Sequence, residues 1–132
     1  MPFKWRDDRE EHLMDKLETF QFVEFPFSVE LKGFDFFPPK VVFVDVMKNE
    51  KLNRLQMELS TYVRREMNLF NADYKDRPFH PHMTIAFRDL KKSRFDDAER
   101  YFKSKDYFVN FDVNNFCLLK HDEKRWNEFR YF

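Results

Sequence analysis

Two histidines and a threonine lie close together in one short stretch of the chain, RPFHPHMTIAF, which covers residues 77 to 87. They are His80, His82 and Thr84, and the whole sequence holds only four histidines. An imidazole can give or accept a proton near neutral pH, and a hydroxyl can donate a hydrogen bond to a phosphate oxygen. This combination suits acid–base chemistry on a phosphodiester.

The segment that carries these side chains has the pattern of a short β-strand. Alternate residues of a strand share a face, so His82, Thr84 and Ala86 are predicted to point in one direction. The intervening residues are apolar and are predicted to point the other way, into the core: Met83, Ile85 and Phe87. The strand would then present an imidazole and a hydroxyl side by side on one face.

The elements around this strand follow from hydrophobic periodicity and turn residues. In order, they are helix 7–20, strand 27–34, strand 40–46, helix 49–70, strand 82–87, helix 94–105, strand 106–119 with a bulge at its asparagine pair, and strand 126–132. This order predicts an α+β fold with mainly antiparallel sheets and helices packed on one side of each sheet.

The composition excludes several classes of protein. Lys plus Arg equals Asp plus Glu, at 24 each, so no net charge favours nucleic acid or a membrane surface. The single glycine, Gly33, excludes the glycine-rich phosphate loops. The single cysteine, Cys117, excludes an internal disulfide and suits a reducing compartment. With no long apolar run and no secretory pattern in the first residues, the sequence predicts a cytoplasmic protein without membrane association.

The residues FHPHMTIAF, at 79–87, resemble the second of two H-x-T-x motifs in the two-histidine phosphoesterases. This superfamily includes the 2′-5′ RNA ligases and the RNA 2′,3′-cyclic phosphodiesterases. The resemblance implies a bilobal α+β fold in which each lobe supplies one motif to a central cleft. It also implies a mechanism in which one histidine is the general base, the other is the general acid, and the two hydroxyls bind the phosphate without a metal or another cofactor. His82 and Thr84 would be catalytic residues of such a site.

The sequence departs from the family in one respect, because a second H-x-T-x motif is missing. None of the other histidines is followed two residues later by Thr or Ser: His12, His80 and His121. We expect the N-terminal lobe to be incomplete, with the opening strands of the family preceding the point where this chain begins.

The expected organisation is one domain over residues 1–132. Residues 1–48 would be the remainder of the first lobe, and residues 49–132 would form the second lobe with its motif. An unpaired sheet edge beside residues 40–46 and the first helix would then favour a homodimer.

The resemblance implies action on a 2′,3′-cyclic phosphate or a 2′-5′ phosphodiester, at an RNA end or in a small nucleotide. Two alternatives stay open. The chain could be a non-catalytic module that binds a nucleotide or RNA end. It could also be a metal-dependent hydrolase that uses His80 and His82, because an H-x-H pair on a strand has a metal-ligand spacing.

Further side chains near the motif are candidates for substrate binding. Lys75, Arg77 and Arg88 could line a phosphate-binding mouth, although a solvated basic loop would contain the same residues. Phe79 or Tyr74 could stack on an unpaired base, as aromatic side chains do in RNA-binding proteins.

Overall fold

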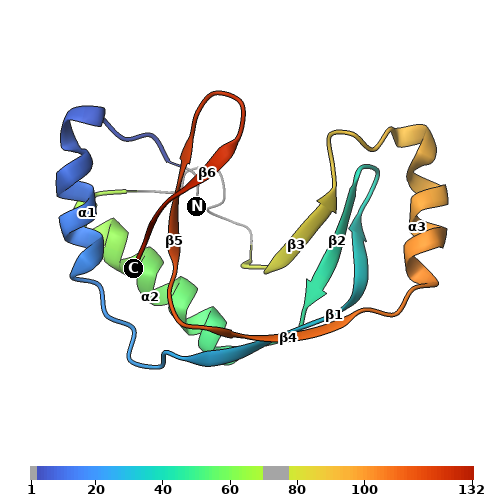
Figure 1. The fold of residues 1–132 in the computed structure, drawn as a ribbon, viewed down its shortest axis with the longest axis horizontal. Coiled ribbons are helices and arrows are strands. Elements are labelled where there is room, and N and C mark those ends of the chain that lie inside the picture. Colours follow the sequence, from blue (N-terminus) through green and yellow to red (C-terminus); the bar gives the residue numbers. More distant parts are fainter. Residues whose placement is uncertain (1–2, 70–77) are drawn as a thin grey trace. The chain divides into compact units, whose positions relative to one another are not determined.

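The computed structural model describes residues 3–69 and 78–132, and the chain divides into two compact units (Figure 1). Unit 1 consists of Met1–Phe27, Glu50–Pro78 and Val113–Phe132, and unit 2 consists of Ser28–Asn49 and Phe79–Asp112. Each unit combines segments that are far apart in sequence, so the division differs from the expected boundary at residue 48. The reason is strand pairing, because the strands that precede residue 49 pair with those that follow residue 78.

Unit 2 contains a four-stranded sheet with the order β3-β2-β1-β4. Its strands are β1 (Phe27–Phe37), β2 (Val41–Val46), β3 (His82–Ala86) and β4 (Phe108–Val113). β2 pairs antiparallel with both β1 and β3. The prediction of an unpaired edge beside residues 40–46 is therefore wrong, since that segment is an inner strand and the outer strands are β3 and β4.

The first half of β1 alternates as the sequence predicts. Its buried side chains are Phe27, Val29 and Leu31, and its exposed ones are Ser28, Glu30 and Lys32. The alternation ends at Gly33, which has a φ of +69° and lies where the pairing with β2 shifts register, between Leu31 and Phe34. A glycine adopts this left-handed conformation without the steric cost that a Cβ brings.

Replacing Gly33 by alanine is expected to lower the free energy of unfolding by about 1–2 kcal/mol, the usual cost of a left-handed conformation for a residue with a Cβ. No atom lies within 4 Å of the position of the added Cβ, so the cost arises from the backbone and not from a clash. Urea denaturation would measure it. Gly33→Asn is the matched control, because asparagine tolerates this conformation better, and an equal or larger loss in that variant would contradict the explanation.

One helix covers one face of this sheet. Helix α3 (Phe95–Lys103) follows the short 3-10 helix η3 (Lys92–Arg94) and lies beside β1 and β2 in Figure 1. The ring of Phe102 lies 5.0 Å from that of Phe34, and the ring of Phe95 lies 6.2 Å from that of Phe36. Aromatic packing thus fixes α3 on the face of β1 that carries Phe34 and Phe36.

The prediction that the apolar residues of the motif strand point into the core is wrong. Met83, Ile85 and Phe87 are 47%, 43% and 47% exposed. β3 is an outer strand, and the ring contacts of α3 in unit 2 are made with β1 and not with β3. These side chains consequently remain at the surface of the unit.

Unit 1 contains two helices and a two-stranded antiparallel sheet. They are α1 (Glu10–Glu18), which follows the 3-10 helix η1 (Asp7–Arg9), α2 (Glu50–Met67), β5 (Cys117–His121) and β6 (Trp126–Tyr131). The core cluster joins the two helices through Leu13, Leu17, Val63 and Met67. The predicted single strand 106–119 is wrong, because its residues form two strands, β4 and β5, that belong to different sheets.

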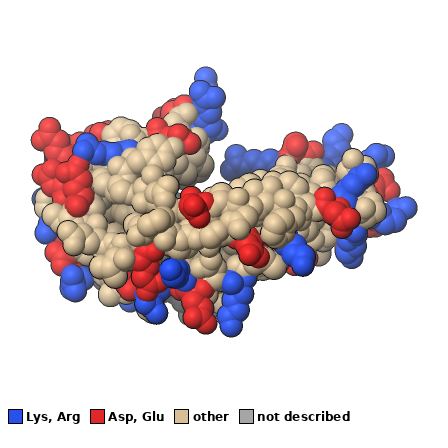
Figure 2. Space-filling model, turned by 60° about the horizontal axis from the view of Figure 1, so that its bottom comes forward, with Lys and Arg blue, Asp and Glu red and all other residues tan. Residues whose placement is uncertain are grey.

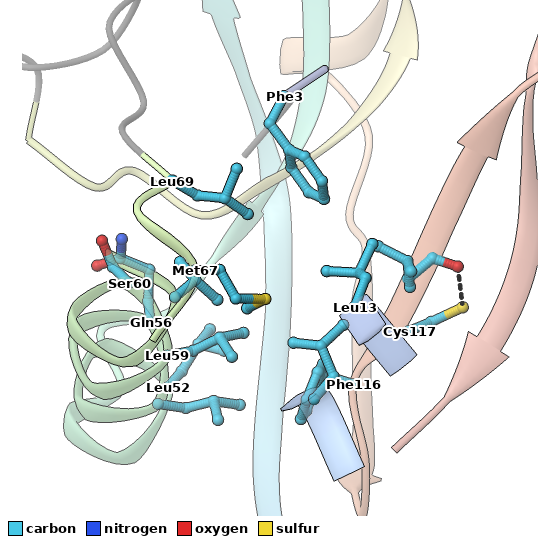
Figure 3. Close-up of a pocket in the computed structure, with 14 residues that line it drawn as sticks. Phe3, Leu13, Leu52, Gln56, Leu59, Ser60, Met67, Leu69, Phe116 and Cys117 are labelled. Atoms are coloured by element: carbon cyan, nitrogen blue, oxygen red, sulfur yellow. Dashed lines mark hydrogen bonds between the residues drawn. The ribbon is translucent and has the colours of Figure 1, made fainter. Parts of the chain in front are cut away.

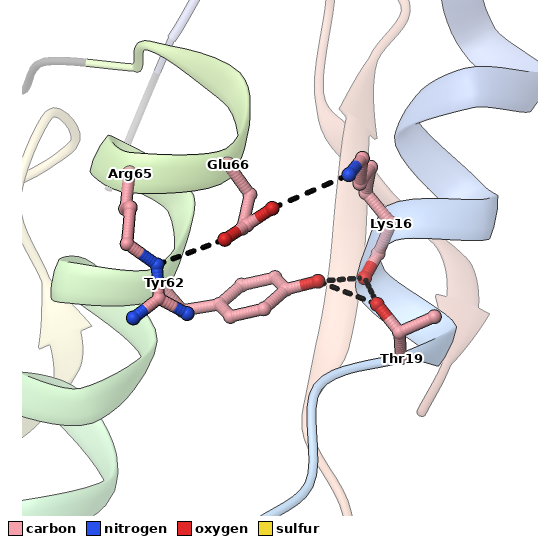
Figure 4. A network of polar contacts seen from close by, with 5 residues as sticks. All are labelled: Lys16, Thr19, Tyr62, Arg65 and Glu66. Carbon is pink, nitrogen blue, oxygen red and sulfur yellow. Dashed lines mark hydrogen bonds and ion pairs between the residues drawn. The ribbon is translucent and has the colours of Figure 1, made fainter.

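A polar network links the end of α1 to the last turns of α2 (Figure 4). The Tyr62 hydroxyl donates to the Lys16 carbonyl at 2.6 Å and lies 2.6 Å from the Thr19 hydroxyl. Glu66 accepts hydrogen bonds from Arg65 Nε at 2.8 Å and from Lys16 Nζ at 3.3 Å. These two donors lower the pKa of Glu66 below its ordinary value. The network ties the two helices together with specific geometry beside their apolar contact.

The surface has no dominant sign of charge. On the face that Figure 2 shows, acidic and basic side chains are interspersed, in keeping with their equal numbers. Among the described residues, no helix is long and apolar enough to cross a membrane. Because acidic and basic side chains are balanced, an anionic ligand must be held by contacts within its own binding site.

Candidate functional site

The residues of the H-x-T-x motif share one face of the sheet in unit 2 with two residues of β2. Antiparallel pairing places His82 opposite Asp45 and Thr84 opposite Phe43. Directly opposed residues point to the same face of a sheet, as do alternate residues of one strand. The imidazole, the hydroxyl and the Asp45 carboxylate are therefore presented on a common surface, as predicted for His82 and Thr84.

Two phenylalanines form a platform for the two histidines. The ring of Phe43 is fully buried, and its centroid lies 5.0 Å from that of His82 and 5.6 Å from that of His80. Phe37, at the end of β1, lies 4.4 Å from Phe43 and 5.2 Å and 5.4 Å from His82 and His80. Contact with these two phenylalanines therefore restricts the positions of both imidazole rings, although both side chains are exposed.

A hydrogen bond defines the proton arrangement of His82. Its Nδ1 lies 2.7 Å from the backbone carbonyl oxygen of His80. A carbonyl oxygen can only accept, so Nδ1 carries the proton and donates it. In the neutral ring, Nε2 then has the lone pair and is the atom that can accept a proton from a reacting group.

His80 has a carboxylate partner on the neighbouring strand. Its Nε2 lies 3.9 Å from Asp45 Oδ1, and the contact is an ion pair when the imidazole is protonated. The centroids of His80 and His82 are 5.9 Å apart. Unit 2 therefore holds two neighbouring imidazoles with different contacts. His82 is hydrogen-bonded to a backbone carbonyl, and His80 lies beside a carboxylate.

The other predicted substrate-binding residues are only partly placed. Phe79 is 44% exposed and precedes β3 by three positions, while Arg88 is exposed two positions after that strand. Lys75, Arg77 and Tyr74 lie outside the described residues. The remaining histidines, His12 and His121, belong to unit 1.

Sequence reasoning missed Phe37 and Asp45 as neighbours of the histidines. Phe37 is one of 19 phenylalanines, and nothing in its local pattern distinguishes it from a core residue. Asp45 carries a signal in retrospect, as a lone acid inside the apolar strand VVFVDV. Its proximity to His80 depends on a strand pairing that includes a register shift between Val42 and Phe43, which the sequence does not reveal.

The described residues contain no group of three or more His, Cys, Asp or Glu side chains placed to hold a metal ion. His80, His82 and Asp45 are not identified as such a group.

Unit 1 contains an apolar cavity of about 270 Å³ (Figure 3). Its lining is dominated by leucines from the two helices, with Phe116 and Cys117 from the segment that leads into β5 and from β5 itself. The polar side chains in the lining are those of Gln56 and Ser60 from α2, with the Cys117 thiol. This lining offers no acid–base pair, so the cavity is not a candidate for phosphodiester chemistry.

The structure therefore has an α+β fold, with an antiparallel sheet, a helix on one face of it, and the H-x-T-x strand at its outer edge. The family model described as "2'-5' RNA ligase superfamily" matches residues 1–125. The chain therefore belongs to the 2′-5′ RNA ligase superfamily, and the family predicted from residues 79–87 is confirmed.

One sequence relative is consistent with this assignment, and one solved structure shares the fold. A protein of Bacillus mycoides (strain KBAB4), named "Putative phosphoesterase BcerKBAB4_1135", is 26% identical over 121 residues, which cover 89% of this chain and 65% of the relative. This chain thus spans about two thirds of the length of that protein. The crystal structure of TT0787 of Thermus thermophilus superposes with a TM-score of 0.65 and 20% identity, over 98% of this chain and 72% of that one. The second likeness shows that the α+β fold is shared.

Proposed function

We propose that this protein is a phosphodiesterase that acts on a 2′,3′-cyclic phosphate or a 2′-5′ linkage, at an RNA end or in a small nucleotide, by histidine acid–base catalysis without a metal. The observation that carries the proposal is the hydrogen bond from His82 Nδ1 to the His80 carbonyl, which leaves Nε2 as the proton acceptor on the face that also holds Thr84. Membership of the 2′-5′ RNA ligase superfamily supports the substrate class.

In the proposed reaction, His82 Nε2 removes a proton from the attacking water. Thr84, on the same strand and the same face, donates a hydrogen bond to a non-bridging phosphate oxygen. Phe79 stacks on the base, and Arg88, together with Lys75 and Arg77, attracts the phosphate. With these roles, a chain that has no net charge would still bind an anionic ligand through local contacts.

A substrate panel tests the proposed class. The purified chain would be incubated, in the presence of a metal chelator, with a nucleoside 2′,3′-cyclic phosphate, a 2′-5′-linked dinucleotide and a 3′-5′-linked dinucleotide. We expect conversion of one or both of the first two and none of the third, measured by chromatography of the products. Equal conversion of all three, or conversion that the chelator abolishes, would contradict the proposal.

A binding-only function, in which the chain recognises a nucleotide or an RNA end without catalysis, is the second candidate. In that case the chain would bind a nucleoside 2′-monophosphate or an RNA end in calorimetry but would release no product. His82→Ala would then weaken binding instead of abolishing turnover.

We also propose that the chain works in the cytoplasm and tends to form a homodimer. The single cysteine supports the first point. Large apolar side chains exposed on the outer strands β3 and β4, among them Met83, Ile85 and Phe108, support the second. Light scattering coupled to size exclusion would test self-association, and a monomer at all accessible concentrations would contradict it.

A further inference from the structure

We propose that His80 is the second proton-transfer group of this site, that it acts as the general acid, and that Asp45 positions it. The inference rests on the proposed function and names the general acid that would act together with His82. Both imidazoles then come from unit 2 and are two positions apart in the sequence.

The first support is the packing of the two rings against a shared platform. The His80 and His82 centroids are 5.9 Å apart, and each lies within 5.6 Å of the centroids of both Phe37 and Phe43. Side chains held in this way keep a defined separation, as reacting groups need. Both rings are thus near enough to contact one phosphodiester on this face.

The second support is that the two imidazoles make different polar contacts. The His80 carbonyl holds the proton of His82 on Nδ1 and leaves its Nε2 free to accept one. His80 Nε2 instead faces the Asp45 carboxylate, which pairs with the protonated ring and leaves the Nδ1 proton available for donation. His82 is therefore suited to be the base and His80 the acid.

For hydrolysis of a 2′,3′-cyclic phosphate, these roles give a balanced step. His82 Nε2 takes one proton from water while the water oxygen forms a new bond to phosphorus. The bond from phosphorus to one ribose oxygen breaks with its electron pair on that oxygen, which takes the Nδ1 proton of His80. One water is consumed, a phosphomonoester is formed, and the proton on His82 returns to His80 through solvent before the next turnover.

The structure separates the role of the His80 side chain from that of its backbone. The carbonyl that orients His82 belongs to the main chain and is retained in His80→Ala. The titratable groups that the described structure places against the His80 ring are Asp45 on β2 and His82 on β3. An effect of His80→Ala on proton transfer can then be assigned to the lost imidazole.

The test is the pH dependence of kcat for a nucleoside 2′,3′-cyclic phosphate in four forms of the protein. They are the wild-type chain, His80→Ala, Asp45→Asn and the control His12→Ala, whose imidazole is exposed on α1 in unit 1. For His80→Ala we expect kcat to fall by about 10²-fold or more, the usual contribution of a general acid, with KM changed less than about threefold. We expect the wild-type rate to fall at high pH as the acid loses its proton, and this alkaline limb to disappear in His80→Ala.

Rescue by free imidazole distinguishes a proton-transfer role of the His80 side chain from a structural one. Free imidazole is expected to restore part of the kcat of His80→Ala, as it can enter the space left by the ring, and to leave wild-type turnover unchanged. Asp45→Asn is expected to lower kcat less than His80→Ala and to gain nothing from imidazole.

The outcomes separate this inference from the proposed function. Turnover by the wild-type chain that persists within threefold in His80→Ala, with its alkaline limb intact, would overturn the role of His80 and leave the proposed function standing. A loss of kcat that imidazole does not rescue would also overturn it, because the side chain would then act through structure. No turnover by the wild-type chain under any condition would overturn both.

Discussion

Replacing His82 by alanine is expected to lower kcat for a nucleoside 2′,3′-cyclic phosphate by about 10²–10⁴-fold, the range typical of a positioned acid–base group. His82 Nε2 is the only atom assigned to accept a proton from the attacking water. The hydrogen bond from Nδ1 to the His80 carbonyl leaves Nε2 of the neutral ring unprotonated. The acidic limb of the pH profile, where the base becomes protonated, should disappear with the side chain. Steady-state kinetics over a range of pH would measure both effects.

This loss should not come from unfolding. His82 is exposed on an outer strand, and substitutions of exposed side chains usually change stability by about 0.5 kcal/mol or less. A thermal melt of His82→Ala close to that of the wild-type chain is therefore the control, with His12→Ala as a matched histidine substitution elsewhere. Retention of wild-type turnover by a folded His82→Ala protein would contradict the role assigned to this ring.

Replacing Phe43 by alanine is expected to lower the free energy of unfolding by about 3–5 kcal/mol, as is usual when a buried phenylalanine is truncated. Phe43 is fully buried, and its ring contacts Phe37 and both histidines. Its removal takes away apolar burial and also the platform on which the imidazoles lie. Denaturation in urea would measure the change.

Phe43→Leu is the matched control for this substitution, because leucine preserves much of the volume and should cost less than half as much. Val23→Ala controls for the loss of apolar atoms at the surface, since Val23 is 89% exposed, and it should have little effect. A Phe43→Ala protein as stable as Val23→Ala would show that the ring does not support the site in the way described.

The sequence predicted the elements well where a local pattern determines them. The alternation of residues 27–32, the apolar stripe of α2 and the H-x-T-x strand all carry their structure in their own periodicity. The motif also led to the correct superfamily, because the histidine and threonine at H-x-T-x spacing occur within flanking residues, FHPHMTIAF, that resemble those of the family.

The sequence failed where the answer depends on which strands become neighbours. Residues 106–119 alternate with one shift of phase at the asparagine pair, which suggested a bulge, yet they supply β4 to one sheet and β5 to another. The exposure of Met83 and Ile85 reflects the packing of α3, whose ring contacts in unit 2 are made with β1, and the proximity of His80 to Asp45 depends on the pairing of β3 with β2. None of these depends on a local pattern, so periodicity could not reveal them.

The most direct test of the central claim is phosphorus NMR of a nucleoside 2′,3′-cyclic phosphate incubated with this chain at neutral pH in the presence of a metal chelator. Parallel samples would contain the wild-type chain and His82→Ala at equal concentration. We expect the cyclic phosphate signal to be replaced by a phosphomonoester signal in the wild-type sample and to persist in the variant. An unchanged cyclic phosphate in both samples, or equal conversion by both, would contradict a metal-free reaction at the His82 and Thr84 face.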